Sequence, residues 1–399
     1  MNFLLKRNLS RLVVFITLMT CSASFACSSF ALKNNGRLFL GYNNDNHYYM
    51  HYCVMTNNSG VIKTAFINHK NPAKWTSKYG SITFNIAKDF PLTGMNQKGL
   101  VVTDMALNNY DSNEYPFPKT KNNPFIQEGS QWIQYQLDNS ANVKEVIDST
   151  RKLNLIPQMG FPNFLDHFFI CDKEGHIAVI EFMRGEMIVH TGNELPVPLV
   201  TNWKYDSELY NLVKFLKFDN KNKPDLSKAP MYSDTWQDGY IDDPRSIRGT
   251  YLLEKYEKNP GKSLLNDAFD ILNHMHKFFK KNDYNQNNFE VVYNPKSMIL
   301  YFNTKKNRKI RELKFSDFSF SKPSLGLICD ANKNITNVKK DFLPYSQKLN
   351  REQGELYMSQ RINGMGIYKK PKLLKQIHKI GNMMIEYPNT FKFVKNNHK

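Results

Sequence analysis

Acidic residues, cysteines and long apolar runs are all scarce in this chain of 399 residues, and each shortage excludes a class of protein. There are 36 acidic against 54 basic side chains, so the formal net charge is +18. Five cysteines in a chain of this length do not form a disulfide-built scaffold. No apolar run approaches the roughly 20 residues of a membrane-spanning helix. With 41% apolar residues, the composition is that of a globular protein.

Motifs that bind nucleotides, nucleic acids or metals are missing as well. There is no glycine-rich phosphate loop, no GxGxxG fingerprint and no zinc-finger spacing. His274 and His276 lie two apart on a predicted helix and would face different sides, so neither a metal nor a cofactor is expected. The basic residues are scattered, which indicates a basic surface and not a nucleic-acid site. Weak contact with an anionic membrane surface stays open.

The first 26 residues have the three parts of a secretory signal peptide. Lys6, Arg7 and Arg11 form a positive region, a short apolar run covers 12–19, and Ser24-Phe25-Ala26 supplies small residues for cleavage. The pattern predicts removal of 1–26 and a periplasmic or secreted mature protein. A lipoprotein anchored at Cys21 is the weaker alternative, because larger residues precede that cysteine.

Cleavage after Ala26 would make Cys27 the first residue, with a thiol and an α-amine on the same residue. The ordinary pKa values of the two groups, about 8.5 and about 7.7–8.0, are close, so the amine can accept the thiol proton near neutral pH. Such a residue is nucleophile and base together and needs no histidine. The alternative, an ordinary buried or disulfide-bonded cysteine, is left open by this stretch alone.

The order of the predicted elements favours an α+β fold with antiparallel sheets over a doubly wound parallel fold. Turn residues at 33–36 and 57–60 predict two hairpins, and a polar loop that could cover a site is predicted at 219–243. We predict a catalytic domain over 27–330 and a basic, peripheral C-terminal extension over 331–399. The predicted strands are 27–32, 37–43, 52–56, 61–67, 81–86, 100–107, 168–171, 176–182, 187–189, 289–293, 298–303 and 312–315, with a short apolar run at 199–202, and the predicted helices are 131–137, 143–153, 206–218, 246–256 and 263–280.

Two polar residues are candidates to support a thiol nucleophile. Asp45 ends the second strand of the first hairpin, where it could orient the α-ammonium of Cys27 or simply cap the strand. Asn202 ends the run LVTN and could donate a side-chain N–H to an oxyanion. A buried asparagine in a core network is the commoner explanation for such a residue.

Five short motifs in order, over about residues 27–320, resemble the choloylglycine hydrolase family, which includes penicillin V acylases and bile salt hydrolases. The resemblance implies an Ntn-hydrolase αββα sandwich, two antiparallel sheets between helical layers, and hydrolysis of a linear carboxamide by an N-terminal cysteine. It also implies a small-molecule N-acyl amide as substrate, and a homo-oligomer is expected. The motifs are CSSF at 27–30, GYNND at 41–45, GMNQKGLVV at 94–102, LVTN at 199–202 and RSIR at 245–248.

The same resemblance assigns roles to five positions. Cys27 matches the nucleophile and general base, Asp45 the aspartate of the family's GRNxD stretch, and Asn202 its oxyanion asparagine. Arg245 matches the arginine that opens the family's last motif, and the second oxyanion donor, a backbone N–H, falls at Ala106.

One position departs from the family pattern. Tyr42 stands where bile salt hydrolases and penicillin acylases carry an arginine, unless the match slides by one residue to Asn43. The departure argues against bile salts or penicillin V as substrates and leaves amide hydrolysis in general untouched. A non-catalytic exported protein that binds a membrane or an anionic partner, and an acyltransferase that uses the same thioester, are the alternative functions.

Overall fold

The computed structural model describes residues 27–46, 48–107, 120, 122–157, 165–183, 185–216, 244–276, 287–321 and 323–394. The predicted signal peptide and the predicted loop at 219–243 lie outside these residues.

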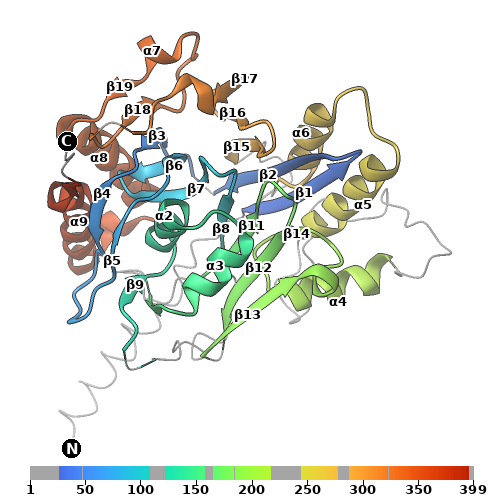
Figure 1. Cartoon of the computed structure of the whole chain (residues 1–399), viewed down its shortest axis with the longest axis horizontal. Helices are drawn as coiled ribbons and strands as arrows, with labels where there is room; N and C mark the ends of the chain where they lie inside the picture. The colour runs from blue at the N-terminus through green and yellow to red at the C-terminus, as the bar shows by residue number, and fades with distance from the viewer. Residues whose placement is uncertain are drawn as a thin grey trace, which may run out of the picture.

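Two antiparallel sheets form the centre of the molecule (Figure 1). The six-stranded sheet has the order β14 (Leu199–Val200), β1 (Ser28–Asn34), β2 (Arg37–Asp45), β15 (Asn287–Asn294), β16 (Ile299–Thr304) and β17 (Asn307–Lys314). The nine-stranded sheet has the order β13 (Glu186–Thr191), β12 (Ile177–Met183), β11 (Asp166–Cys171), β8 (Val101–Ala106), β7 (Phe90–Asn96), β6 (Ser81–Ala87), β3 (Cys53–Asn57), β18 (Leu327–Asp330) and β19 (Leu343–Pro344).

Helices cover the outer face of each sheet. Alternate residues of a strand point to opposite faces, so one set of apolar side chains faces the other sheet and the next set faces the helices. Phe30 and Leu32 of β1 pack against α5 (Pro244–Lys258) and α6 (Leu264–His274). On the other sheet, Val102 and Phe168 pack against α2 (Ser130–Asn139) and α3 (Val143–Thr150). The remaining α-helices and strands of the described residues are α4 (Tyr205–Leu216), α7 (Val338–Asp341), α8 (Gln347–Gly364), α9 (Pro371–Glu386), the parallel pair β9 (Phe125–Gln127) and β10 (Asn154–Ile156), and a small sheet of β4 (Val61–Thr64), β5 (Lys74–Thr76) and β20 (Lys392–Phe393).

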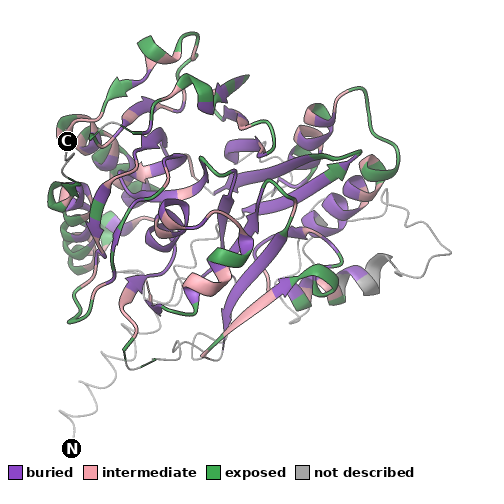
Figure 2. Cartoon of the chain, viewed as in Figure 1, coloured by how far each residue is buried: buried purple, intermediate pink, exposed green. Residues whose placement is uncertain are grey.

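The core between the two sheets is aromatic. Phe84 of β6 stacks on Phe289 of β15 with ring centroids 5.1 Å apart, and Tyr42 of β2 lies 5.7 Å from the same Phe289 ring. The inner strands of both sheets are buried over most of their length, whereas the edge strands β13, β17 and β19 and the outer helices carry exposed residues (Figure 2). The layers are therefore helix, sheet, sheet, helix, as predicted.

The first predicted hairpin is confirmed, and the second is wrong. Asn35 and Gly36 have φ of 47° and 74° and connect β1 to β2, as a two-residue hairpin turn requires. The second turn is present, but β3 pairs with β6 while β4 pairs with β5. The hydroxyl of Ser77 donates to the carbonyl of Asn58 and accepts from the N–H of Val61, so the turn is held by Ser77 instead of closing a hairpin. Strand β7 was missed because its sequence FPLTGMN contains proline and glycine, which are rare in strands.

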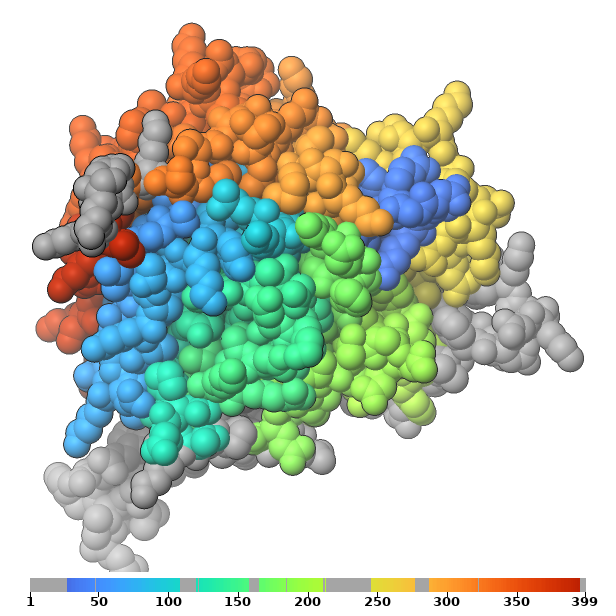
Figure 3. All heavy atoms as spheres, in the orientation of Figure 1, coloured from blue at the N-terminus to red at the C-terminus, as the bar shows by residue number. Residues whose placement is uncertain are grey.

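The C-terminal residues extend into the body of the molecule. Strand β18 pairs with β3, and α8 packs against β6. The ring of Tyr357 lies in the core between the sheets, 5.8 Å from the ring of Tyr52. In the space-filling view, orange and red C-terminal residues lie directly against the blue N-terminal third (Figure 3). The division at residue 331 stays a prediction.

A buried lysine makes the stability of this fold depend on pH. Lys88 is 2% exposed, and its ammonium donates to the carbonyl of Thr56 and to Oδ1 of Asn57. Burial lowers the pKa of Lys88 to about 7, whereas in an unfolded chain it is about 10.4. The unfolded state therefore binds more protons above pH 7, so this residue makes the protein more stable as pH rises.

We expect Lys88 to contribute about 1–2 kcal/mol of added stability between pH 7 and pH 8.5. The measurement is the free energy of unfolding from urea denaturation at pH 7 and at pH 8.5. Its rise between these two pH values should be about 1–2 kcal/mol smaller in Lys88→Met than in wild type, and the variant should be less stable at both. The exposed Lys340→Met should keep the wild-type pH dependence. Equal pH dependence in Lys88→Met and wild type would contradict the assignment.

Candidate active site

Cys27 lies directly before β1 and is 4% exposed. Its sulfur accepts hydrogen bonds from the side-chain amide of Asn44, at 3.4 Å, and from the hydroxyl of Tyr42, at 3.7 Å. Both donors come from β2, the partner strand of the hairpin. The hairpin therefore places two neutral donors against the thiol.

The strand register shows which residue stands beside the thiol. Ser28 pairs with Asn43, and the hydroxyl of Ser28 donates to Oδ1 of Asn43 at 3.0 Å. Because adjacent residues of a strand point to opposite faces, Tyr42 and Asn44 share one face, and Asn43 lies on the other. Tyr42, and not Asn43, is thus the residue next to the nucleophile candidate.

Asn202, Arg245 and Ala106 meet at the same point. One N–H of the Asn202 side chain donates to the carbonyl of Ala106 at 2.7 Å, and Arg245 donates through Nη2 to Oδ1 of Asn202 at 2.9 Å. Arg245 also donates through Nη1 to the backbone carbonyl of Cys27 at 3.2 Å. A guanidinium can only donate and a carbonyl can only accept, so these partners define the orientation of the Asn202 amide.

Asp45 is fully buried at the end of β2. The side-chain amide of Asn287 on β15 donates to its Oδ1 at 3.0 Å. The negative charge of Asp45 is close enough to Cys27 to raise the pKa of the thiol. The residue is therefore placed among buried polar partners and not at an exposed strand end.

The surroundings of the thiol disfavour a thiolate while residue 26 remains attached. Burial raises the pKa of Cys27 most, followed by the charge of Asp104, and Asp45 adds to this. The hydrogen bond from Tyr42 and the charge of Arg245 lower it. An additional positive charge or base at this point would be needed to activate the sulfur.

Sequence reasoning missed Asn44 and Asp104. Asn44 lies within the GYNND motif, and alternation along β2 would have marked it as facing the same side as Tyr42. Asp104 is 6% exposed on β8, and its Oδ1 accepts from the Tyr42 hydroxyl at 3.4 Å. Nothing in its local sequence distinguishes it from a residue of an ordinary strand.

The hydrogen bonds of His167 go to groups other than the Cys27 thiol. His167 is fully buried on β11, with Nδ1 at 3.1 Å from Glu181 and Nε2 at 2.9 Å from the carbonyl of Thr201. Its position beside Thr201 holds the backbone that leads into Asn202. His176 bonds to Asp172.

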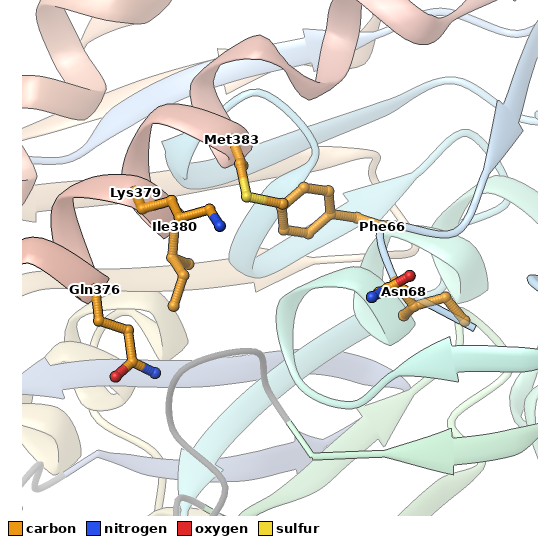
Figure 4. Close-up of a pocket in the computed structure, with 7 residues that line it drawn as sticks. Phe66, Asn68, Gln376, Lys379, Ile380 and Met383 are labelled. Carbon is orange, nitrogen blue, oxygen red and sulfur yellow. The ribbon is translucent and has the colours of Figure 1, made fainter.

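Two further features lie away from Cys27. Among the described residues no group of three or more histidine, cysteine or acidic side chains could hold a metal, and no described helix is long and apolar enough to cross a membrane. A groove of about 500 Å³ lies between the segment after β4 and helix α9 (Figure 4), and none of the site residues named above lines it. It is lined by Phe66, Ile67, Asn68, Gln376, Lys379, Ile380 and Met383.

Comparison with known families identifies the chain. A family model described as linear amide C–N hydrolases, choloylglycine hydrolase family, matches residues 27–337, and the match begins at the site cysteine. The chain belongs to this family. The predicted reaction class, hydrolysis of carbon–nitrogen bonds in linear amides, is therefore confirmed at the level of the family.

Three relatives and solved structures show how this member of the choloylglycine hydrolase family compares with known proteins. It is 31% identical to a penicillin V acylase of Pectobacterium atrosepticum over 147 residues, which cover 34% of this chain and 38% of that protein. The structure of penicillin V acylase from Agrobacterium tumefaciens matches with a TM-score of 0.63 and 17% identity, over 80% of this chain and 98% of that one.

A variant of conjugated bile acid hydrolase from Clostridium perfringens matches with a TM-score of 0.58 and 19% identity, over 80% of this chain and 99% of that one. At these identities the structures establish the fold alone. They confirm the Ntn-hydrolase sandwich predicted from the sequence.

Proposed function

We propose that this chain is an exported amidohydrolase that cleaves the C–N bond of an N-acyl amide through a thioester on Cys27. The observation that supports it most is the double contact of Arg245, which bonds both the carbonyl of Cys27 and the side chain of Asn202. One side chain thereby links the nucleophile to the candidate oxyanion donor.

Activation would begin with cleavage between Ala26 and Cys27. The new α-amine accepts the thiol proton and supplies the positive charge that the buried thiolate lacks. Asp45 is positioned to orient the ammonium. This explains why the thiol is unfavourably placed for ionisation in the uncleaved chain, because its base is then part of a peptide bond.

The thiolate then attacks the carbonyl carbon of the substrate. The negative charge that develops on the carbonyl oxygen is stabilised by the second N–H of Asn202 and by the backbone N–H of Ala106. Collapse of this intermediate breaks the C–N bond, and the departing amine takes the proton from the α-ammonium. Water, activated by the free α-amine, hydrolyses the thioester and restores the thiol.

A panel of amide substrates identifies the acyl chain and the amine leaving group. Tyr42 places a neutral hydroxyl at the thiol, where the resemblance led us to expect an arginine. Penicillin V and a conjugated bile acid, named for the relatives, belong in the panel with straight-chain N-acyl amides.

Maturation is tested by mass spectrometry of the N-terminal peptide of the purified protein. We expect the active protein, isolated from the periplasm or medium of the expressing cell, to begin at Cys27. Ala26→Tyr, which blocks signal cleavage by its size, should abolish activity, whereas Lys6→Arg should change neither cleavage nor activity. Full activity in a chain that begins before Cys27 would overturn the mechanism.

A further inference from the structure

The hydroxyl of Tyr42 lies between two acceptors. Its oxygen is 3.7 Å from the Cys27 sulfur and 3.4 Å from Oδ1 of Asp104. A phenol carries a single hydrogen, so it can donate to only one of the two at a time. Asn44 donates to the same oxygen at 3.4 Å and keeps the ring in place between them.

Asp104 is surrounded by groups from several elements. The titratable and charged groups that face it are Cys27 before β1, Tyr42 of β2, Asp166 of β11 and Tyr357 of α8. Burial, followed by the charge of Asp166, raises the pKa of Asp104 well above its ordinary range. A carboxyl in such surroundings stays protonated to higher pH than an exposed aspartate does, and a protonated carboxyl is a donor.

We propose that Asp104 is a positioning residue that directs the Tyr42 hydroxyl toward or away from the Cys27 sulfur. When Asp104 is protonated, its O–H donates to the Tyr42 oxygen, and Tyr42 donates its own hydrogen to the sulfur. When Asp104 is ionised, it takes the Tyr42 hydrogen bond for itself, and its charge opposes the thiolate. The nucleophile is therefore most reactive with Asp104 neutral.

This inference rests on Cys27 being the nucleophile of the proposed function, but it can be tested without any amide substrate. The probe is iodoacetamide, which alkylates thiolates. The rate is followed by the mass of the peptide that contains Cys27, in the protein as purified and with its N-terminus read first. Each rate is taken from pH 5 to pH 9.5.

The decisive quantity is the rate for Asp104→Asn divided by the rate for wild type. Asparagine donates to Tyr42 as the protonated acid does and never ionises. We expect a ratio near one at pH 5 that rises to about tenfold at the alkaline end, the effect of one pKa unit on the thiol. A ratio that is the same at every pH overturns the proposal, since a merely structural role would not depend on pH.

Two variants separate this role from general damage to the site. Asp166→Asn removes the charge that favours the protonated form of Asp104. Alkylation of Cys27 near neutral pH should therefore be slower in this variant than in wild type, whereas in Asp104→Asn it should be faster. The same ratio can be measured in proteins that also carry Tyr42→Phe, as the alkylation rate with Asn at position 104 divided by the rate with Asp. Its rise with pH should be at least twofold smaller than when Tyr42 is present. A change in the same direction for both aspartates, or an undiminished rise without the hydroxyl, contradicts the proposal.

The outcomes also distinguish this inference from the proposed function. If alkylation follows the expected pattern while no amide in the panel is cleaved, the hydrolase proposal fails and the role of Asp104 stands. If amides are cleaved but the ratio does not change with pH, the hydrolase proposal stands and Asp104 has no such role. Circular dichroism of each variant confirms that the fold is retained.

Discussion

Cys27→Ala is expected to abolish amide hydrolysis while the protein remains folded. The loss should be on the order of 10⁶-fold, because removing the nucleophile of a covalent mechanism leaves only binding and oxyanion stabilisation. The truncation removes one sulfur atom from the edge of the core, which costs only about 1 kcal/mol of stability. The measurement is kcat/KM on the best amide of the panel, with the melting temperature recorded alongside.

Cys171→Ala is a matched control for this experiment. Cys171 is also a free, buried cysteine whose side chain lies in the same core between the sheets. It lies on β11, and its thiol donates a hydrogen bond to the carbonyl of Asp172. It should lose as much stability and keep wild-type turnover. Cys27→Ser should retain the fold and lose most of the activity, since a hydroxyl is a weaker nucleophile. Substantial activity in Cys27→Ala would refute a thioester mechanism.

Asn202→Ala should lower kcat by about 10²–10³-fold with little change in KM. The side-chain N–H is worth most when the carbonyl oxygen carries negative charge, so its loss is felt in the transition state more than in the bound substrate. Removal of the amide also removes the oxygen that accepts from Nη2 of Arg245 at 2.9 Å, which weakens the contact from Arg245 to the nucleophile. Steady-state kinetics over a wide substrate range separates kcat from KM.

Two further variants identify the cause of that loss. Asn202→Asp keeps the size of the side chain and the contact to Arg245 but removes the N–H, so it should be as inactive as Asn202→Ala. Asn350→Ala removes an equally buried asparagine of α8, which bonds to Ile385 and Lys88, and should reduce stability without reducing kcat. A tenfold or smaller loss in Asn202→Ala would argue for a purely structural asparagine.

Local patterns predicted the elements better than their partners. The β1–β2 hairpin follows from Asn35 and Gly36, residues that accept positive φ, and the meander of β11, β12 and β13 follows from short strands separated by glycine turns. The prediction of the second hairpin was wrong because a turn signal does not determine which strand the chain pairs with after the turn. In the structure β3 pairs with β6 and β4 with β5, and Ser77, which is distant from the turn in sequence, bonds to the turn.

The sequence by itself predicted many of the strands and helices up to residue 315 and the motif set of the family. It also predicted the closeness of Cys27 to the end of β2, because a hairpin returns the chain to its start. Only the tertiary structure decided the rest of the site. Asn202 and Arg245 reach Cys27 because strand order and helix packing bring together residues far apart in the chain.

The same holds for Asp104, whose carboxyl meets Tyr42 from the other sheet. Burial of that carboxyl beside Asp166 changes its proton affinity, and burial is a property of packing that no local pattern records.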